Sequence, residues 1–214
     1  VLELASGRER ALTTDGDGTV SNGVAEFIAQ EEMDRHTGYW WSPDERHVAV
    51  TRVDESPVPE VERFEVHAAG VKVYRQRYPA AGTANALVSL SVIDTGSGAR
   101  QAIDLGPDTD IYVARVDWFP EGERLLVQRQ SRDQKTLDLI AYPLEGGEPP
   151  RPVRDTSDRW VDLHDDLRFV EGRRQFVWSS QRTGHKHLYL YDYDGTLVRP
   201  LTAGDWDAWA LPEG

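Results

Sequence analysis

Hydrophobic and polar residues alternate along most of the chain in a pattern that predicts β-strands. One unit, made of a large apolar run, a tight turn and a second apolar run, occupies residues 39–50, 116–127 and 167–178. Pro43 and Pro120 of the first two copies are 77 positions apart, whereas Phe119 and Phe169 of the last two are 50 apart. The shorter interval is near the period of a propeller blade, so the longer one carries extra residues.

This pattern predicts an all-β fold, a partial β-propeller of about three four-stranded blades with blade remnants at both ends, one short helix and an inserted hairpin arm. The predicted segments are 1–20 (outer strands of a preceding blade), 21–38 (the helix), 39–106 (a blade with the arm inserted at 55–86), 107–155 (a blade), 156–203 (a blade) and 204–214 (the start of a next blade). Neither end of the chain matches a blade boundary, so we expect an internal piece of a larger propeller.

The predicted helix places two acidic residues on an apolar face. Val24, Phe27 and Ile28 have the spacing of one helical face, and continuing that face leads to Glu31 and Glu32. Two carboxylates therefore stand where the pattern asks for apolar residues. They form either a solvent-exposed acidic helix end or a binding site for a cation. The expected boundary residues are Ser21 or Asn22 as the cap, Met33 at the end of the apolar face and Gly38 as the stop.

The chain is strongly acidic. Its 214 residues contain 24 Lys plus Arg against 37 Asp plus Glu, a formal net charge of −13 at pH 7, so nucleic acid is excluded as a partner. Cysteine is absent, which rules out disulfides and a thiol nucleophile and is compatible with a periplasmic or otherwise exported bacterial protein. We expect no membrane segment, because no apolar run approaches the roughly 20 residues that cross a bilayer, and no signal peptide.

Three polar clusters could suggest catalysis or metal binding, and each has a simpler interpretation. Residues 15–18 (DGDG) lack the other ligands of a calcium loop and are interpreted as a turn. His164 lies beside two aspartates but has neither a nucleophile nor an H-E-x-x-H pattern, which favours a loop role. Ser97 and Ser179 stand outside any G-x-S-x-G elbow. The sequence therefore predicts no catalytic residue, no metal site and no cofactor.

Four stretches resemble motifs of the dipeptidyl peptidase IV family of serine peptidases. They are residues 27–33 (FIAQEEM), 39–44 (YWWSPD), 78–85 (YPAAGTAN) and 181–191 (QRTGHKHLYLY). The first two are similar to the double-glutamate helix of that family and the strand that follows it. The resemblance extends over essentially the whole chain, and the paired glutamates are its most specific part, because many propellers share the blade motifs.

The resemblance implies a portion of the propeller of an aminodipeptidase, which releases N-terminal dipeptides whose second residue is Pro or Ala. Glu31 and Glu32 would bind the α-ammonium of the peptide substrate, and an α/β-hydrolase domain of the same parent chain would supply the catalytic Ser, Asp and His. The fragment alone would be inactive, and the arm at 55–86 would join two subunits in a homodimer. One departure is the loop at 160–165, which lacks the arginines that family members place near the substrate.

The chemistry of paired carboxylates agrees with this implication. A peptide α-ammonium carries three N–H donors and has a pKa of about 8, and two adjacent carboxylates supply charge-assisted acceptors for it. A bound ammonium also relieves the repulsion between the two carboxylates. The alternative from a different class is a non-catalytic propeller module, with no hydrolase attached, that only binds a protein partner.

Overall fold

The computed structural model describes residues 1–209, which belong to two compact units, one ending at Asp110 and the other beginning at Ile111. Antiparallel β-sheets make up nearly all of the regular structure, so the predicted all-β class is confirmed. Residues 1–209 contain one helix, α1 (Phe27–Glu32), and it is too short to cross a membrane.

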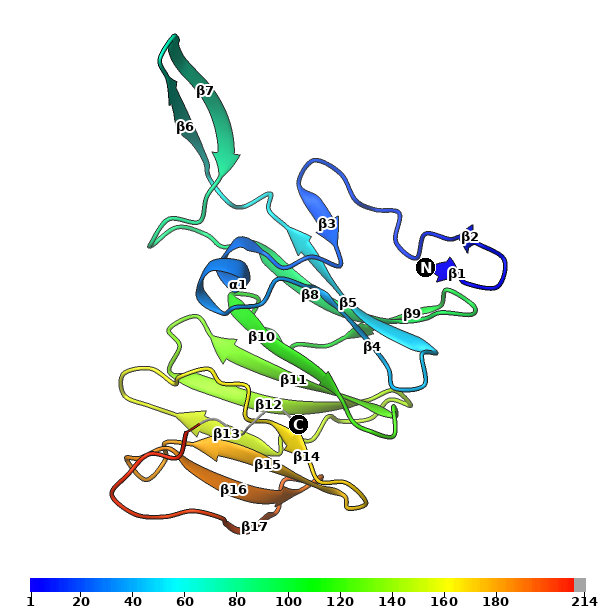
Figure 1. Ribbon diagram of the computed structural model, residues 1–214, viewed down its shortest axis with the longest axis vertical. Helices are drawn as coiled ribbons and strands as arrows, with labels where there is room; N and C mark the ends of the chain where they lie inside the picture. Colours follow the sequence, from blue (N-terminus) through cyan, green and yellow to red (C-terminus); the bar gives the residue numbers. More distant parts are fainter. Residues whose placement is uncertain (210–214) are drawn as a thin grey trace. The chain divides into compact units, whose positions relative to one another are not determined.

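A five-stranded sheet forms the centre of the first unit (Figure 1). Its strands are β3 (Val20–Asn22), β4 (Tyr39–Trp41), β5 (His47–Asp54), β8 (Leu87–Asp94) and β9 (Arg100–Ile103). The order is β3-β5-β8-β9, and β4 lies on the same edge of β5 as β3, pairing with the first half of that strand while β3 pairs with its end. Val48, Val50 and Ile93 form a buried cluster against which Leu12 packs.

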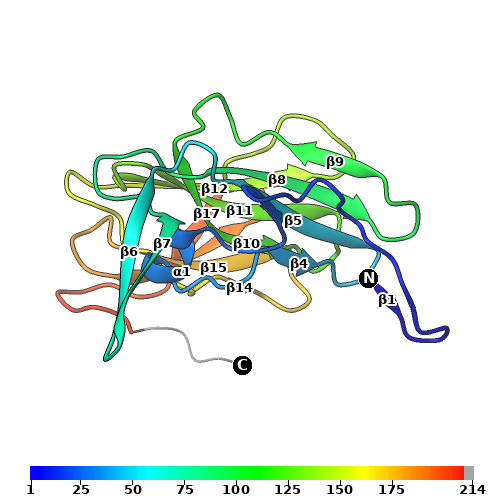
Figure 2. The ribbon, with the colours of Figure 1, turned by 90° about the horizontal axis from the view of Figure 1, so that it is seen from above.

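Two hairpins extend from this unit on different sides (Figure 2). The short one pairs β1 (Leu2–Glu3) with β2 (Arg8–Glu9), and the long one pairs β6 (Glu60–His67) with β7 (Gly70–Arg77). The long hairpin lies inside the predicted arm and projects away from the five-stranded sheet (Figure 1). The inserted hairpin arm is therefore confirmed.

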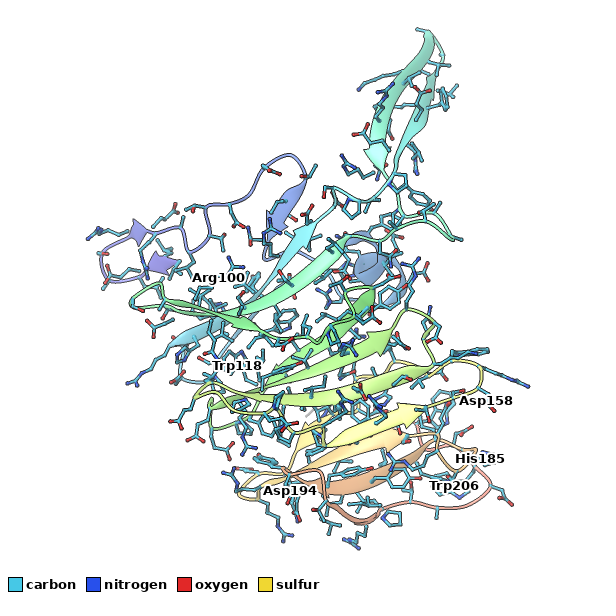
Figure 3. All side chains as sticks on the ribbon, turned by 180° about the vertical axis from the view of Figure 1, so that it is seen from behind. Arg100, Trp118, Asp158, His185, Asp194 and Trp206 are labelled. Atoms are coloured by element: carbon cyan, nitrogen blue, oxygen red, sulfur yellow. The ribbon has the colours of Figure 1, made fainter. Side chains whose placement is uncertain are left out.

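The second unit contains two four-stranded antiparallel sheets. The first, in the order β10-β11-β12-β13, consists of Ile111–Trp118, Arg124–Ser131, Thr136–Pro143 and Val153–Thr156. The second, in the order β14-β15-β16-β17, consists of Arg168–Phe169, Gln175–Ser180, His187–Asp192 and Leu197–Pro200. Side chains of both sheets, including Leu126, Leu139, Phe176 and Tyr189, share one buried core. Figure 3 draws the side chains on the ribbon.

The three sequence repeats form equivalent hairpins, β4-β5, β10-β11 and β14-β15. Each turn is closed by a backbone N–H that donates to a carbonyl five residues later. The pairs are Ser42 to His47 (2.9 Å), Phe119 to Arg124 (3.0 Å) and Val170 to Gln175 (2.9 Å). The repeat therefore marks the first hairpin of each sheet, as the pattern predicts.

The two predicted blade remnants have little regular structure. Residues 1–20 contain β1, β2 and the first residue of β3, and residues 204–209 contain no strand. Residues 210–214 of the second remnant lie outside the described residues. The assignment of both remnants to neighbouring blades, and the remaining segment boundaries, stay predictions.

Candidate functional site

Residues 23–38 leave the edge of β5 and return to it, and this segment is called the helix loop below. Gly23 N–H donates to Thr51 O at 2.9 Å, Thr51 N–H donates to Gly38 O at 2.8 Å, and Gly38 N–H donates to Gly23 O at 3.3 Å. The Thr51 hydroxyl lies 2.9 Å from Val24 O. A Cβ on Gly38 would lie 2.2 Å from Thr51 Oγ1 and 2.3 Å from Val24 O, so only glycine fits. The helix loop is thus closed at its base.

Helix α1 within this loop is shorter than the sequence predicts, since it covers Phe27–Glu32 rather than most of residues 21–38. The predicted caps, Ser21 and Asn22, lie in β3 and pair with β5. Their backbone is extended for this long-range pairing, which prevents the helix from beginning there. The helix instead begins after Glu26, without a side-chain hydrogen bond at its N-terminus.

The buried face of the helix also differs from the predicted one. Ala25, Ala29 and Met33, spaced four residues apart, are buried, whereas Val24 is 43% exposed. A spacing of four residues keeps side chains on one helical face, so small residues and one flexible residue pack against the unit. The prediction that the face of Val24, Glu31 and Glu32 is the apolar, packed face is therefore wrong, because all three residues are exposed.

Glu31 and Glu32 lie beside the buried face, and both are exposed to solvent. They are the last two residues of α1, and its last turn contains no basic residue. The C-terminal end of a helix carries a partial negative charge, so two carboxylates there are unfavourable without a cation. Within residues 1–209, neither glutamate forms an ion pair. The pair is accessible to a cationic ligand from solvent.

The chain reverses direction directly after these glutamates. Asp34 adopts a left-handed conformation with φ of 50°, and Arg35 N–H then donates to Ala29 O at 3.0 Å. The Arg35 guanidinium reaches back to Glu26, with Nη2 2.7 Å from Oε2, and the two side chains are only 4% and 5% exposed. Arg35 Nη1 also donates to Thr37 O at 2.8 Å. A buried ion pair therefore joins the residues that flank the helix.

Two motifs that are distant in sequence meet at Phe27, the first residue of α1. The rings of Phe27 and Tyr78 make an edge-to-face contact with centroids 5.1 Å apart. Tyr78 follows the arm, and the guanidinium of Arg63 on β6 lies 5.9 Å from its ring centroid. Tyr78 N–H donates to Pro59 O, which closes the base of the arm. The glutamate motif at 27–33 and the motif at 78–85 are therefore neighbours.

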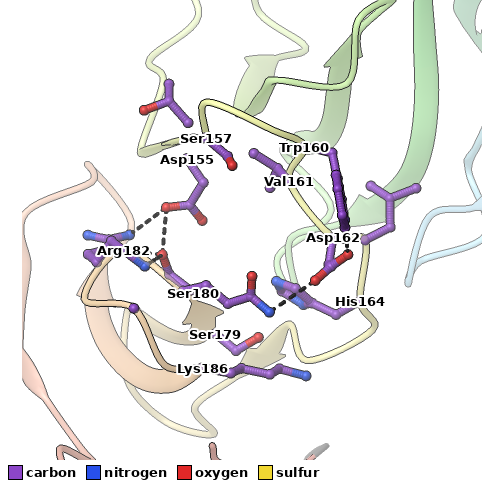
Figure 4. Close-up of a pocket in the computed structure, with 14 residues that line it drawn as sticks. Asp155, Ser157, Trp160, Val161, Asp162, His164, Ser179, Ser180, Arg182 and Lys186 are labelled. Carbon is purple, nitrogen blue, oxygen red and sulfur yellow. Dashed lines mark hydrogen bonds and ion pairs between the residues drawn. The ribbon is translucent and has the colours of Figure 1, made fainter. Parts of the chain in front are cut away.

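The second unit contains a polar cavity of about 430 Å³ (Figure 4). Asp155 accepts hydrogen bonds from Trp178 Nε1, Ser180 Oγ and Arg182 Nη2 at 2.7 to 3.1 Å. Residues 160–164 also line the cavity, and Asp162 among them accepts hydrogen bonds from Trp160 Nε1 and from Gln181 Nε2. Asp155 is thus paired with Arg182, and Asp162 is held by two neutral side chains.

His164 has a structural role at the wall of this cavity, in agreement with the loop interpretation. Burial lowers the pKa of His164, although the nearby Asp166 carboxylate opposes that change. The ring centroids of His164 and Trp178 are 4.2 Å apart, and His164 Nδ1 accepts a hydrogen bond from Asp166 N–H at 3.3 Å. Asp166 in turn accepts from Ser179 Oγ and pairs with Lys186 Nζ at 2.6 Å. In the described part of the chain, no three His, Asp or Glu side chains are arranged to hold a metal ion.

Comparison with known proteins identifies the family. The family model for the dipeptidyl peptidase IV (DPP IV) N-terminal region matches residues 1–211. The chain belongs to the dipeptidyl peptidase IV family. Dipeptidyl peptidase 4 of Arthroderma otae is 26% identical over 221 residues, covering 96% of this chain and 28% of that protein. Dipeptidyl peptidase 8 of Mus musculus is 29% identical over 216 residues, covering 79% of this chain and 24% of that protein.

A solved structure supports the same assignment. The crystal structure of Porphyromonas gingivalis dipeptidyl peptidase 4 matches with a TM-score of 0.89 and 29% identity, covering 97% of this chain and 30% of that one. The resemblance drawn from the four motifs and the partial β-propeller are therefore confirmed. The chain spans less than a third of the length of these dipeptidyl peptidase IV relatives. The role of Glu31 and Glu32 stays a prediction.

Sequence reasoning missed the ion pair that flanks the helix in this dipeptidyl peptidase IV propeller. Glu26 and Arg35 are nine positions apart, a spacing that does not bring side chains together on any regular helix. They meet only because Asp34 reverses the chain. The signal that could have indicated the pair is Arg35, a single arginine in an otherwise acidic stretch. It follows Asp34, and aspartate tolerates the left-handed backbone that a chain reversal needs.

Asp117 on β10 is a largely buried carboxyl whose titration predicts a change of stability with pH. Burial raises its pKa to about 6, the Asp165 carboxylate adds to the rise, and Arg115 and Arg168 oppose it. An unfolded aspartate has a pKa of about 3.9, so the folded state binds this proton more tightly. The contribution of Asp117 to stability is therefore present below about pH 4 and is lost as the pH rises through about 6.

Replacing Asp117 with Asn removes the buried charge. We expect the free energy of unfolding to rise by about 2 kcal/mol at pH 8 and to change little at pH 4, as measured by urea denaturation. Asp133→Asn is the matched control, because hydrogen bonds from the Ser131 hydroxyl and Lys135 N–H lower the pKa of Asp133. Removing this carboxylate should therefore not raise the free energy of unfolding at pH 8. A gain for Asp117→Asn that is the same at both pH values would contradict this expectation.

Proposed function

We propose that this chain is the propeller portion of a serine exopeptidase that releases Xaa-Pro or Xaa-Ala dipeptides, and that it gates substrates and recognises their free amino terminus. Membership of the dipeptidyl peptidase IV family supports the reaction class. The observation that carries the proposal is the exposed Glu31–Glu32 pair, which ends a helix inside a loop that is closed at its base.

The two carboxylates suit one end of such a substrate. A peptide α-ammonium offers three N–H donors to the acceptors of Glu31 and Glu32, and its positive charge offsets both their repulsion and the partial charge of the helix C-terminus. An extended peptide advances about 3.3 to 3.6 Å per residue, so fixing the amine places the second carbonyl roughly 7 Å away. The helix would therefore measure the length of the released dipeptide.

The reacting groups would come from an α/β-hydrolase domain of the same parent protein. No serine in this sequence stands in a G-x-S-x-G motif. The propeller would bind and orient the peptide, and the hydrolase domain would supply the nucleophile at the measured distance. The chain by itself would then release no dipeptide.

The arm would join two subunits in the parent enzyme. Phe64 pairs with Val73 and Val66 pairs with Val71, which places four apolar side chains on one face of the β6-β7 hairpin. Each of these side chains is more than half exposed. An exposed apolar face on a projecting hairpin is typical of an interface, and a symmetric dimer would bury it against its counterpart.

Charge placed on this face of the arm tests the interface. We expect the double substitution Phe64→Glu/Val73→Glu to convert the parent enzyme from dimer to monomer, measured by light scattering. Glu65→Lys is the matched control, because Glu65 belongs to the same hairpin but alternates to its other face. An unchanged dimer in the double variant would show that the arm does not join the subunits.

Dipeptide release by the full-length protein tests the proposed function. Chromogenic substrates with a free N-terminus and Pro or Ala in second position should be cleaved, and the same substrates with an acetylated N-terminus should be poor, because they carry no ammonium. Equal cleavage of both forms would refute recognition of the amine. Absence of cleavage of either form would favour the non-catalytic binding module.

A further inference from the structure

We propose that the Glu26–Arg35 ion pair is a positioning element that fixes the orientation of Glu31 and Glu32 toward the substrate ammonium. This inference rests on the proposed function of the two glutamates. Glu26 and Arg35 would not touch the substrate. They would act through the helix that carries the binding pair.

Helix α1 cannot hold its shape alone. It has six residues, about 9 Å along its axis, and helices of this length are unstable in isolation. No side chain caps its N-terminus, and its last turn combines two acidic residues with a helix end of the same sign. Its geometry must therefore be imposed by contacts outside the helix.

The ion pair provides such a contact at both ends of the helix. Glu26 directly precedes the first helical residue, and Arg35 lies three residues after the last one, with Nη2 2.7 Å from Glu26 Oε2. Arg35 is also tied to the returning chain, since Nη1 donates to Thr37 O and the guanidinium lies 5.8 Å from the ring centroid of Trp40 on β4. The helix is thus clamped between its own flanks and the sheet.

The Glu26–Arg35 ion pair, called the clamp below, is better suited to fixing the orientation of the helix than to stabilising the fold. Both side chains are almost fully buried, and Glu26 Oε1 is buried without a hydrogen-bond partner among the described residues. A buried ion pair is often no more stabilising than apolar residues of the same size, because desolvation opposes the attraction. It does impose direction, since the planar guanidinium donates its N–H groups to a carboxylate only in its own plane.

The clamp also keeps its charges away from the ligand. The negative charge of Glu26 is neutralised by Arg35, and the arginine is turned inward rather than toward the exposed glutamates. Glu31 and Glu32 therefore remain without an ion-pair partner within residues 1–209. A cationic substrate would meet two unpaired carboxylates at a fixed spacing.

The experiment measures kcat/KM of the full-length protein for substrates with free and acetylated N-termini. We expect Arg35→Lys, which keeps the charge and loses the planar fork, and Glu26→Gln to lower kcat/KM at least tenfold for the free substrate, mainly through KM. The acetylated substrate should lose less than twofold. The reversed pair Glu26→Arg/Arg35→Glu should recover part of the discrimination.

Arg154→Lys is the control, since it weakens the two-point ion pair with Asp138 in the other unit. It should leave unchanged the ratio of kcat/KM for the free substrate to kcat/KM for the acetylated substrate.

Each outcome decides between a positioning role and a merely structural one. Equal losses for both substrates, or full discrimination retained in Arg35→Lys and Glu26→Gln, would overturn the positioning role. Wild-type protein that does not distinguish the two substrates would refute the proposed function itself. If the reversed pair fails to fold, the milder Arg35→Lys variant still gives the ratio that decides the question.

Discussion

Replacing Gly38 with Ala is expected to lower the free energy of unfolding by about 3 kcal/mol. The added Cβ would lie 2.2 Å from Thr51 Oγ1 and 2.3 Å from the Val24 carbonyl oxygen, and the second of these atoms belongs to the backbone. Relief would require the base of the helix loop to open, which would break the hydrogen bonds that join Gly38 to Gly23 and Thr51. Urea denaturation of the full-length protein measures the loss.

Gly18→Ala is the matched control for this substitution. Gly18 lies in the exposed turn before β3, and a Cβ there meets no atom within 4 Å. The free energy of unfolding of the Gly18→Ala variant should differ from that of the native protein by less than about 0.5 kcal/mol. If the two alanine variants were equally stable, the base of the loop would not be as tight as the geometry indicates.

Replacing either Glu31 or Glu32 with Ala is expected to reduce kcat/KM for free-amine substrates about 10- to 150-fold. The reason is the loss of one charge-assisted contact of roughly 1.5 to 3 kcal/mol. Stability should change much less, because both side chains are exposed and the helix gains nothing from two like charges at its C-terminal end. Steady-state kinetics and thermal denaturation of the same variants separate the two effects.

Asp34→Asn controls for the general electrostatic effect of removing a negative charge. Asp34 is exposed and two residues from Glu32, and asparagine also tolerates its left-handed φ of 50°. A loss of kcat/KM for Asp34→Asn as large as that for the glutamate variants would mean that overall charge, rather than the pair, attracts the substrate.

Local pattern predicted those features whose cause is local. The turns at 42–47, 119–124 and 170–175 appear in the sequence because Pro, Gly and charged residues interrupt apolar runs, and each run forms a strand. The arm was predictable for the same reason, as alternating residues with no place in a four-stranded blade. The double glutamate was noticed from the apolar spacing that leads to it, and the family resemblance supplied its role. Its position at an accessible helix end agrees with that role, which stays a prediction.

The boundaries of the helix could not be predicted, because a distant strand determines them. Ser21 and Asn22 are good helix caps by residue type, yet pairing with β5 draws them into a strand. The sequence predicts Gly38 as the residue that ends the helix. In the structure Gly38 instead packs so closely against Thr51 and the Val24 carbonyl that no Cβ fits. The clamp between Glu26 and Arg35 likewise exists only after the chain has reversed at Asp34.

A double cycle that crosses Glu31→Ala or Glu32→Ala with free and acetylated substrate N-termini measures the contact between carboxylate and amine directly. We predict that each substitution lowers kcat/KM about 10- to 150-fold for the free substrate and leaves the already poor acetylated substrate nearly unchanged. Equal losses on both substrates would contradict this, and Glu31 and Glu32 would then be an exposed acidic helix end with no part in recognising the amino terminus.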